Sequence, residues 1–196
     1  MKKIYTLVST LLLSLMLQGC LPILFLGGVA AGGIIGGVVI YDHRSTSTVM
    51  ADHEISYNAE SKLNENAEIK NKTHISVAVF NRIVLLVGQA PTQELKNEAE
   101  NLVKPTPKIK LLHNEITIEE PTSTTTRAHD SWITTKVKSI LLAEKGLATS
   151  QVKIITENSV IYIMGLATRE QTDIISEKVR QIDGVTKVVK LVEYIN

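Results

Sequence analysis

The chain has 196 residues, enough for one medium-sized domain or two small ones, and its 21 Lys and Arg balance 20 Asp and Glu to a formal charge of +1. This near-neutral balance argues against a broad electrostatic surface for nucleic acid, so we expect no nucleic-acid partner. Five scattered histidines and a single cysteine, Cys20, exclude an internal disulfide and give no metal-ligand spacing, so we expect no metal and no cofactor.

The first twenty residues have the pattern of a secretory signal. Two lysines precede an apolar stretch over residues 4–17, which is the order of a charged n-region and an h-region. The stretch ends in Leu17-Gln18-Gly19-Cys20, which resembles the lipobox of bacterial lipoproteins, where cleavage falls just before a cysteine that becomes acylated. The sequence therefore predicts a signal peptide over residues 1–19 and lipidation of Cys20. The residue after this cysteine is Leu21 rather than Asp. In lipoproteins of Gram-negative bacteria, this resembles a signal for the outer membrane rather than for retention in the inner membrane.

The next segment, residues 21–40, is apolar and uncharged and contains six glycines. Its length alone would allow it to span a membrane, and its glycine spacing would allow close helix packing. Pro22, the many glycines and the adjacent lipid anchor favour instead a segment that lies on or partly in the membrane. Residues 41–51 are polar and Ser/Thr-rich, which is typical of a tether. We therefore assign residues 20–51 to the acylated cysteine, an apolar segment and a tether.

The rest of the chain contains the same pattern twice. Residues 81–90 and 158–167 both begin with Asn and one further polar residue, continue with five apolar residues and close with Gly-x-Ala. An apolar run of this kind predicts a strand that is covered on both faces. The Asn residues stand where a tight turn enters the strand and tolerate the positive φ that such turns need. Gly88 and Gly165 then mark a bulge or a close backbone approach, so we interpret them as structural residues.

The flanking sequences repeat in the same order. Alternating apolar residues precede each strand and predict a hairpin, and a helix with apolar i, i+4, i+7 spacing follows it. Thr168 with Gln171 is a capping-box pattern at the start of the second of these helices. Final strands are predicted at about 109–118 and 185–195. A further helix opens each repeat, with Asp52 and Asp130 as plausible N-caps.

These elements predict an α+β protein with two tandem αββαβ domains, each a three-stranded mixed sheet with two helices. We expect the first domain at residues 52–118 and the second at residues 128–196. Residues 119–127 contain Pro121 and five consecutive Ser or Thr residues, and they predict a flexible interdomain linker.

The helix that opens the second domain has an unusual outer face. Its apolar stripe is formed by Ile133, Val137, Ile140 and Leu141, whereas Trp132 and Leu142 point away from that stripe, with Lys136 on the same side. A tryptophan beside a lysine suits a membrane interface. The alternative is that Trp132 packs against the first repeat or the linker, since Trp is also a common anchor at protein interfaces.

The order helix, strand, strand, helix, strand, used twice behind a lipobox, resembles the BON domain family and its outer-membrane lipoproteins with two such domains. The resemblance implies a periplasm-facing protein that is anchored in the outer membrane and supports its integrity. It also implies binding of anionic phospholipid, phosphatidylglycerol or cardiolipin, through the first helix of the second domain. Carried over by position, the lipid contacts would be Trp132, Lys136, Val137 and Leu142. Helix geometry supports three of these but turns Val137 towards the core.

Two other classes of function are alternatives to lipid binding. As an interaction adaptor, the protein would use the same helix to dock an envelope-assembly protein or a regulator of a cell-wall enzyme, and such docking would persist on neutral lipid. As an enzyme it would need a catalytic pattern, but the sequence has no Gly-x-Ser-x-Gly and no phosphate loop. The adjacent Glu119 and Glu120 are more simply a solvated charge run. We therefore expect a protein without catalytic residues.

Overall fold

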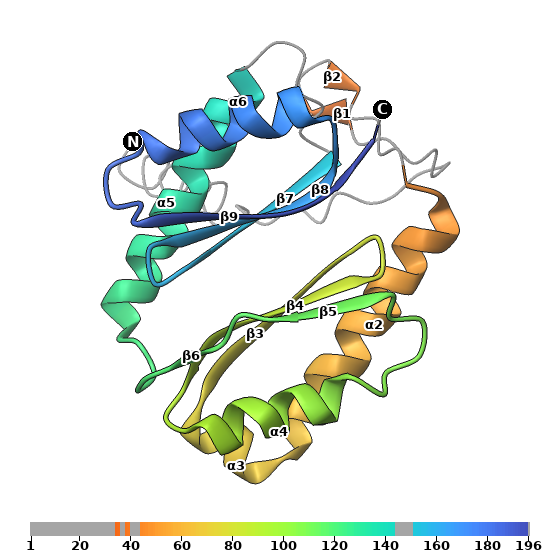
Figure 1. The fold of residues 1–196 in the computed structure, drawn as a ribbon, viewed down its shortest axis with the longest axis vertical. Coiled ribbons are helices and arrows are strands. Elements are labelled where there is room, and N and C mark those ends of the chain that lie inside the picture. Colours follow the sequence, from red (N-terminus) through yellow and green to blue (C-terminus); the bar gives the residue numbers. More distant parts are fainter. Residues whose placement is uncertain (1–33, 36–37, 40–43, 144–150, 196) are drawn as a thin grey trace, which may run out of the picture. The chain divides into compact units, whose positions relative to one another are not determined.

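The computed structural model describes residues 34–35, 38–39, 44–143 and 151–195 (Figure 1). Cys20 and most of the apolar segment at residues 21–40 lie outside the described residues. Within that segment, the strands β1 (Ile34–Ile35) and β2 (Val38–Val39) pair in antiparallel orientation. Of the helices that the structure describes, none combines the length and the apolar character needed to cross a membrane.

The first repeat forms a mixed sheet with helices on one face. In this sheet β3 and β4 are antiparallel, and β5 and β6 both run parallel to β4. The final strand predicted at about 109–118 is thus divided in two, with the buried Ile116 in the gap. The elements are α2 (Thr46–Glu65), α3 (Ala67–Lys72), β3 (His74–Phe80), β4 (Ile83–Ala90), α4 (Gln93–Val103), β5 (Leu111–Asn114) and β6 (Thr117–Ile118).

The second repeat has the same order and a three-stranded sheet. Here β7 and β8 are antiparallel, and β9 runs parallel to β8. The predicted capping box is confirmed, because Thr168 accepts from Gln171 N and Gln171 reaches back to Thr168 N. The predicted α+β class is confirmed as well. The elements are α5 (Thr124–Ala143), β7 (Val152–Glu157), β8 (Val160–Ala167), α6 (Arg169–Arg180) and β9 (Lys187–Tyr194).

Each central strand is buried on both faces, and two different partners cover it. Alternate residues of β4, such as Val84 and Leu86, pack with the helices of their own repeat. The residues between them, such as Leu85 and Val87, join a cluster with Tyr162 and Met164 of the other repeat. The faces of the two sheets that point away from their own helices therefore share one apolar core. All three buried clusters fall within residues 55–182, so residues 42–196 contain complete hydrophobic cores.

Polar contacts between the repeats are reciprocal. Asn81, in the first hairpin turn, donates from Nδ2 to Glu193 at 2.6 Å, and Asn158, in the second turn, donates from Nδ2 to Glu119 at 3.2 Å. Each turn thus reaches the end of the other repeat's sheet. Between them, the buried Gln89 donates from Nε2 to Glu157 at 2.8 Å.

The aspartates predicted as N-caps have a different role. Asp52 lies inside α2, which begins after the N-cap Ser45, and Asp130 lies inside α5. The prediction was wrong because each carboxylate bonds a distant hairpin turn instead of its own helix. Asp52 accepts from Asn81 N at 2.8 Å and Arg82 N at 2.6 Å, and Asp130 does the same for Asn158 N and Ser159 N, at 2.8 and 2.9 Å.

The turns held in this way have left-handed backbones. The φ angles are 51° and 61° at Asn81 and Arg82, and 46° and 65° at Asn158 and Ser159, which is the pattern of a two-residue hairpin turn with both central residues at positive φ. The predicted positive φ at the two Asn residues is confirmed. Arg82 and Ser159 are less suited to this conformation, so the buried carboxylate stabilises a strained backbone.

We expect Asp130→Ala to lower the free energy of unfolding by about 3 kcal/mol, because it leaves two backbone N–H groups without their charged acceptor. Urea unfolding of the variant checks this. Asp183→Ala is the matched control, since it removes an exposed carboxylate and should shift stability by only about 0.5 kcal/mol. Equal effects of the two substitutions would contradict the role assigned to Asp130.

Glu157 makes stability depend on pH. Burial raises the pKa of its carboxyl, and the hydrogen bond from Gln89 opposes this only in part. The folded state therefore holds the proton more tightly than the unfolded state, so stability falls as pH rises from the ordinary carboxyl range through the raised pKa. At pH 8 we expect the free energy of unfolding of Glu157→Gln to be larger than that of the wild type. The difference should decrease towards pH 4. Urea titrations across that range measure this, and a constant difference would refute it.

The segments predicted as tether and linker are partly helical. Helix α2 begins at Thr46 and buries Ala51, while α5 begins at Thr124. The short remaining connection is also held, because Thr122 N and Oγ1 both donate to Gln89 Oε1 at 3.2 Å. Runs of Ser and Thr lack an apolar period, so the sequence does not show that these residues start helices.

Candidate functional site

Helix α5 has one buried side and one exposed side. Ile133, Val137 and Leu141 are buried in a cluster with β7, β8 and α6, as the apolar stripe predicted. On the other side, Trp132 is 48% exposed and Leu142 is 64% exposed. Both are among the few large apolar side chains exposed in the described part of the chain, so this face is a candidate binding surface.

Val137 does not belong to that surface. The resemblance implied a lipid contact, but the side chain is 0% exposed and packs in the core of the second domain. It could contact lipid only if α5 left its sheet. This burial agrees with the helix geometry, which turns Val137 towards the core and away from the candidate site.

Trp132 is held by two neighbours on the same helix. Lys136 Nζ lies 4.4 Å from the centroid of the indole ring, and the His129 ring stacks on it at a centroid distance of 5.5 Å with 23° between the planes. These are i+4 and i−3 neighbours, the positions that share a helix face. Their contacts orient an aromatic ring beside a cation without burying it. His129 was not predicted as part of this face, although it stands three residues before Trp132, a spacing that places both on one side of a helix.

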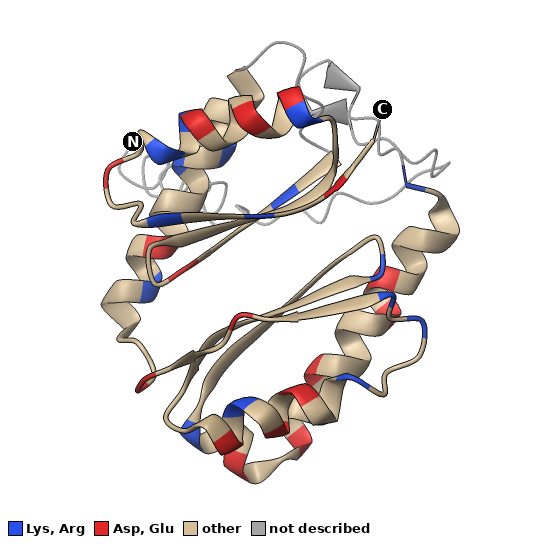
Figure 2. Cartoon of the chain, viewed as in Figure 1, with Lys and Arg blue, Asp and Glu red and all other residues tan. Residues whose placement is uncertain are grey.

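The charge on this part of α5 is entirely positive. Between Ser131 and Ala143 the charged residues are Lys136 and Lys138, and both are exposed. The first domain is different: α4 carries Glu94, Glu98 and Glu100 with a single lysine, and Figure 2 shows this helix as mainly red among its charged positions. Of these two helical surfaces, only α5 suits an anionic partner.

The first domain lacks this combination of side chains. If Asp52 and Asp130 are matched by their common role, the positions of Trp132, Lys136 and Leu142 are occupied in α2 by Glu54, Asn58 and Asn64. Two equivalent helices therefore differ where the candidate site lies. Among the described residues there is also no group of three His, Cys, Asp or Glu side chains that could hold a metal ion.

Comparison with known protein families identifies the same domain in both repeats. The BON domain family model matches residues 51–120 and 129–196. The outer membrane lipoprotein DolP of Haemophilus influenzae is 30% identical over 93% of this chain and 92% of its own length. A 21 kDa hemolysin of Actinobacillus pleuropneumoniae is 35% identical over 79% of each chain. Neither name describes an enzyme.

A solved structure is also similar over part of the chain. It is the C-terminal domain of CdsD, a structural protein of the type III secretion system of Chlamydia trachomatis, at 19% identity over 74% of this chain and 67% of that one. Its TM-score of 0.30 is too low to support an argument.

Proposed function

The chain belongs to the BON domain family as an outer-membrane lipoprotein with two such domains, and we propose that it binds anionic phospholipid through the exposed face of α5. The observation that carries the proposal is the half-exposed Trp132 beside Lys136 on a helix face that bears no acidic residue. We further propose that this binding supports the integrity of the outer membrane, with the domains at residues 52–118 and 128–196 facing the periplasm.

The side chains of this face suit a lipid interface in two ways. An indole ring and a leucine that already lie outside the core can enter the boundary between headgroups and acyl chains with little rearrangement. Lys136 and Lys138 can stay at the level of the phosphates, where each is worth about 1 kcal/mol near an anionic surface. One helix face of this size gives only weak binding, and the predicted acyl chains on Cys20 would supply the second signal that stable anchoring needs.

Flotation of residues 42–196 on vesicles tests the proposal. We expect the protein to float with vesicles that contain phosphatidylglycerol, to float poorly with pure phosphatidylcholine, and to lose binding as salt rises. Equal binding to both vesicles, or binding to neither, would defeat lipid recognition. The second of these outcomes would favour the adaptor function, in which α5 docks an envelope-assembly protein.

We expect Lys136→Glu to weaken binding to phosphatidylglycerol vesicles by about tenfold at low salt and by less at high salt, because it reverses a charge next to anionic headgroups. Flotation at two salt concentrations measures this. Lys70→Glu makes the same change on the exposed surface of α3 and is the matched control. Equal weakening by both variants would show that total charge decides the binding rather than the face of α5.

A further inference from the structure

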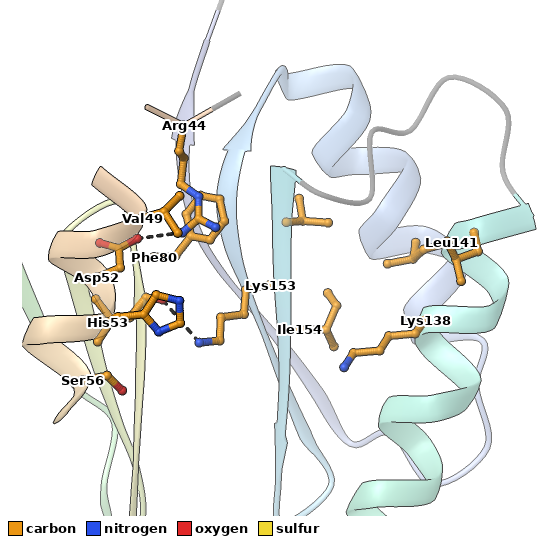
Figure 3. A pocket seen from close by; sticks show the side chains of 13 residues that line it. Arg44, Val49, Asp52, His53, Ser56, Phe80, Lys138, Leu141, Lys153 and Ile154 are labelled. Atoms are coloured by element: carbon orange, nitrogen blue, oxygen red, sulfur yellow. Dashed lines mark hydrogen bonds and ion pairs between the residues drawn. The ribbon is translucent and has the colours of Figure 1, made fainter. Parts of the chain in front are cut away.

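A cleft of about 480 Å³ lies between α2 and β3 of the first domain and α5 and β7 of the second (Figure 3). Its size falls within the range of about 300 to 1,000 Å³ that is usual for small-molecule sites. Much of its wall is apolar and comes from both domains, including Val49, Phe80, Leu141, Val152 and Ile154. These side chains could cover a single hydrocarbon chain.

Cations reach the same cleft from three elements. Arg44 lies just before α2, Lys138 belongs to α5 and Lys153 to β7, and all three line the cleft (Figure 3). Lys153 Nζ also donates to the carbonyl oxygen of Val79 at 3.3 Å, across the two domains. Although part of its side chain is exposed, desolvation at the cleft, and next the charge of Arg44, lower the pKa of Lys153, with Lys138 adding to the effect. The three positive charges therefore repel one another.

The acids near the cleft do not neutralise these cations. Asp52 accepts from Arg44 Nη1 at 2.7 Å, besides its two bonds to the hairpin turn, so its charge is already shared among three donors. Asp52 and Glu60 raise the pKa of Lys153, but less than desolvation and Arg44 lower it. In the described part of the chain, no carboxylate lies within ion-pair distance of Lys138 or Lys153. The cleft keeps an excess of positive charge.

The other end of the paired sheets has a matching hollow, but it is smaller and more polar than the cleft. There, the hollow lined by Asp130 is only about 190 Å³. If the helices are matched on Asp52 and Asp130, Ser131 replaces His53. If the strands are matched on the turn residues Asn81 and Asn158, Thr156 replaces Val79 and Glu157 replaces Phe80. The pairing of the two sheets alone therefore does not produce a large cleft, since the matching hollow at Asp130 is small and polar. The cleft beside Asp52 is large, apolar and cationic because of the side chains that line it.

We propose that this cleft binds one molecule of an anionic amphiphile that carries a phosphate headgroup and a single acyl chain. Lys138 and Lys153 hold the phosphate, because an ammonium is a strong point-charge partner for it. The acyl chain lies against Phe80, Val152 and Ile154. This second lipid site goes beyond the proposed membrane contact and shares Lys138 and Leu142 with it, whereas Lys153 belongs to the cleft alone.

The test uses calorimetric titration of residues 42–196 with lauroyl lysophosphatidic acid below its micellar concentration, once cooperative thermal unfolding of this part has been verified. We expect one molecule to bind per chain, at least tenfold more tightly than lauroyl lysophosphatidylcholine, which has the same chain without net charge. Glycerol 3-phosphate, the headgroup alone, should bind at least tenfold more weakly as well. Equal binding of the two lipids would overturn the cationic site, and equal binding of glycerol 3-phosphate would show a site for free phosphate instead.

Variants locate the site. Lys138→Gln and Lys153→Met should each weaken binding of the lysophosphatidic acid at least fivefold. Lys138 makes no hydrogen bond or ion pair within the described chain, so its substitution does not endanger the fold. Lys187→Gln, on β9, is the matched control and should bind as wild type. Trp132→Glu should also keep this binding, which separates the cleft from the membrane surface. Unchanged binding in both cleft variants would overturn the proposal.

Discussion

Trp132→Glu should abolish flotation on phosphatidylglycerol vesicles while the domain stays folded. The substitution removes the largest apolar contact of the proposed surface and adds a charge that anionic headgroups repel. Because Trp132 is 48% exposed and its ring contacts are with His129 and Lys136 of its own helix, the free energy of unfolding should change by only about 0.5 kcal/mol. Vesicle flotation and thermal unfolding of the same purified variant measure the two effects.

Trp132→Phe is the matched control for this prediction. It keeps an aromatic ring at the same position without adding a charge, so it should retain most of the binding. If Trp132→Glu unfolds the domain, the tryptophan has a structural role and the membrane-contact proposal is wrong. If the variant folds and still binds, Trp132 is not needed for membrane binding and the proposal is also wrong.

Gly165→Val should destabilise the second domain by at least 3 kcal/mol. A Cβ atom at this position would lie 2.3 Å from the carbonyl oxygen of Gln151, just before β7, and 2.9 Å from the Cα of Val152, the first residue of β7. Since β7 and β8 pair across this point, the clash can be relieved only by parting the strands. Urea unfolding measures the loss, and lipid binding should fall with it as a secondary effect.

The control for the glycine is Lys187→Val, which places the same side chain at an exposed position of the same sheet. It should change stability by about 0.5 kcal/mol. Gly88→Val should behave like Gly165→Val in the first domain, because a Cβ there would lie 1.9 Å from the carbonyl oxygen of His74 and the backbone has φ +123°. A Gly165→Val variant as stable as wild type would show that this strand pair tolerates a side chain.

The sequence was sufficient for the features that depend on local pattern. The duplicated strand, the turn Asn residues and the capping box at Thr168 each follow from a few neighbouring residues, and the structure confirms them. The outward direction of Trp132 and Leu142 follows in the same way from helix geometry. Such features are set by backbone periodicity, which one sequence displays directly.

Features that depend on distant partners could not be predicted in this way. Asp52 and Asp130 look like N-caps because their side chains suit that role, but each bonds a turn about 29 residues further along the chain. The cleft combines α2 with α5 and β7, which no local pattern connects. The contact between the two sheets could not be predicted either. A strand that is buried on both faces has the same apolar sequence pattern whether a helix or a second sheet covers it.

The shared sheet faces resemble the interface of a symmetric dimer. A single repeat would expose Phe80, Leu85 and Val87, or Tyr162 and Met164, and would have to cover this face with a second copy of itself. Two identical chains paired in this way would exchange turn contacts reciprocally, as Asn81 and Asn158 do here. The chain thus has the architecture of a symmetric dimer whose two halves are joined covalently. Halves of one chain need not have the same sequence, so only one of the two matching helices carries a tryptophan and only one of the two hollows is wide.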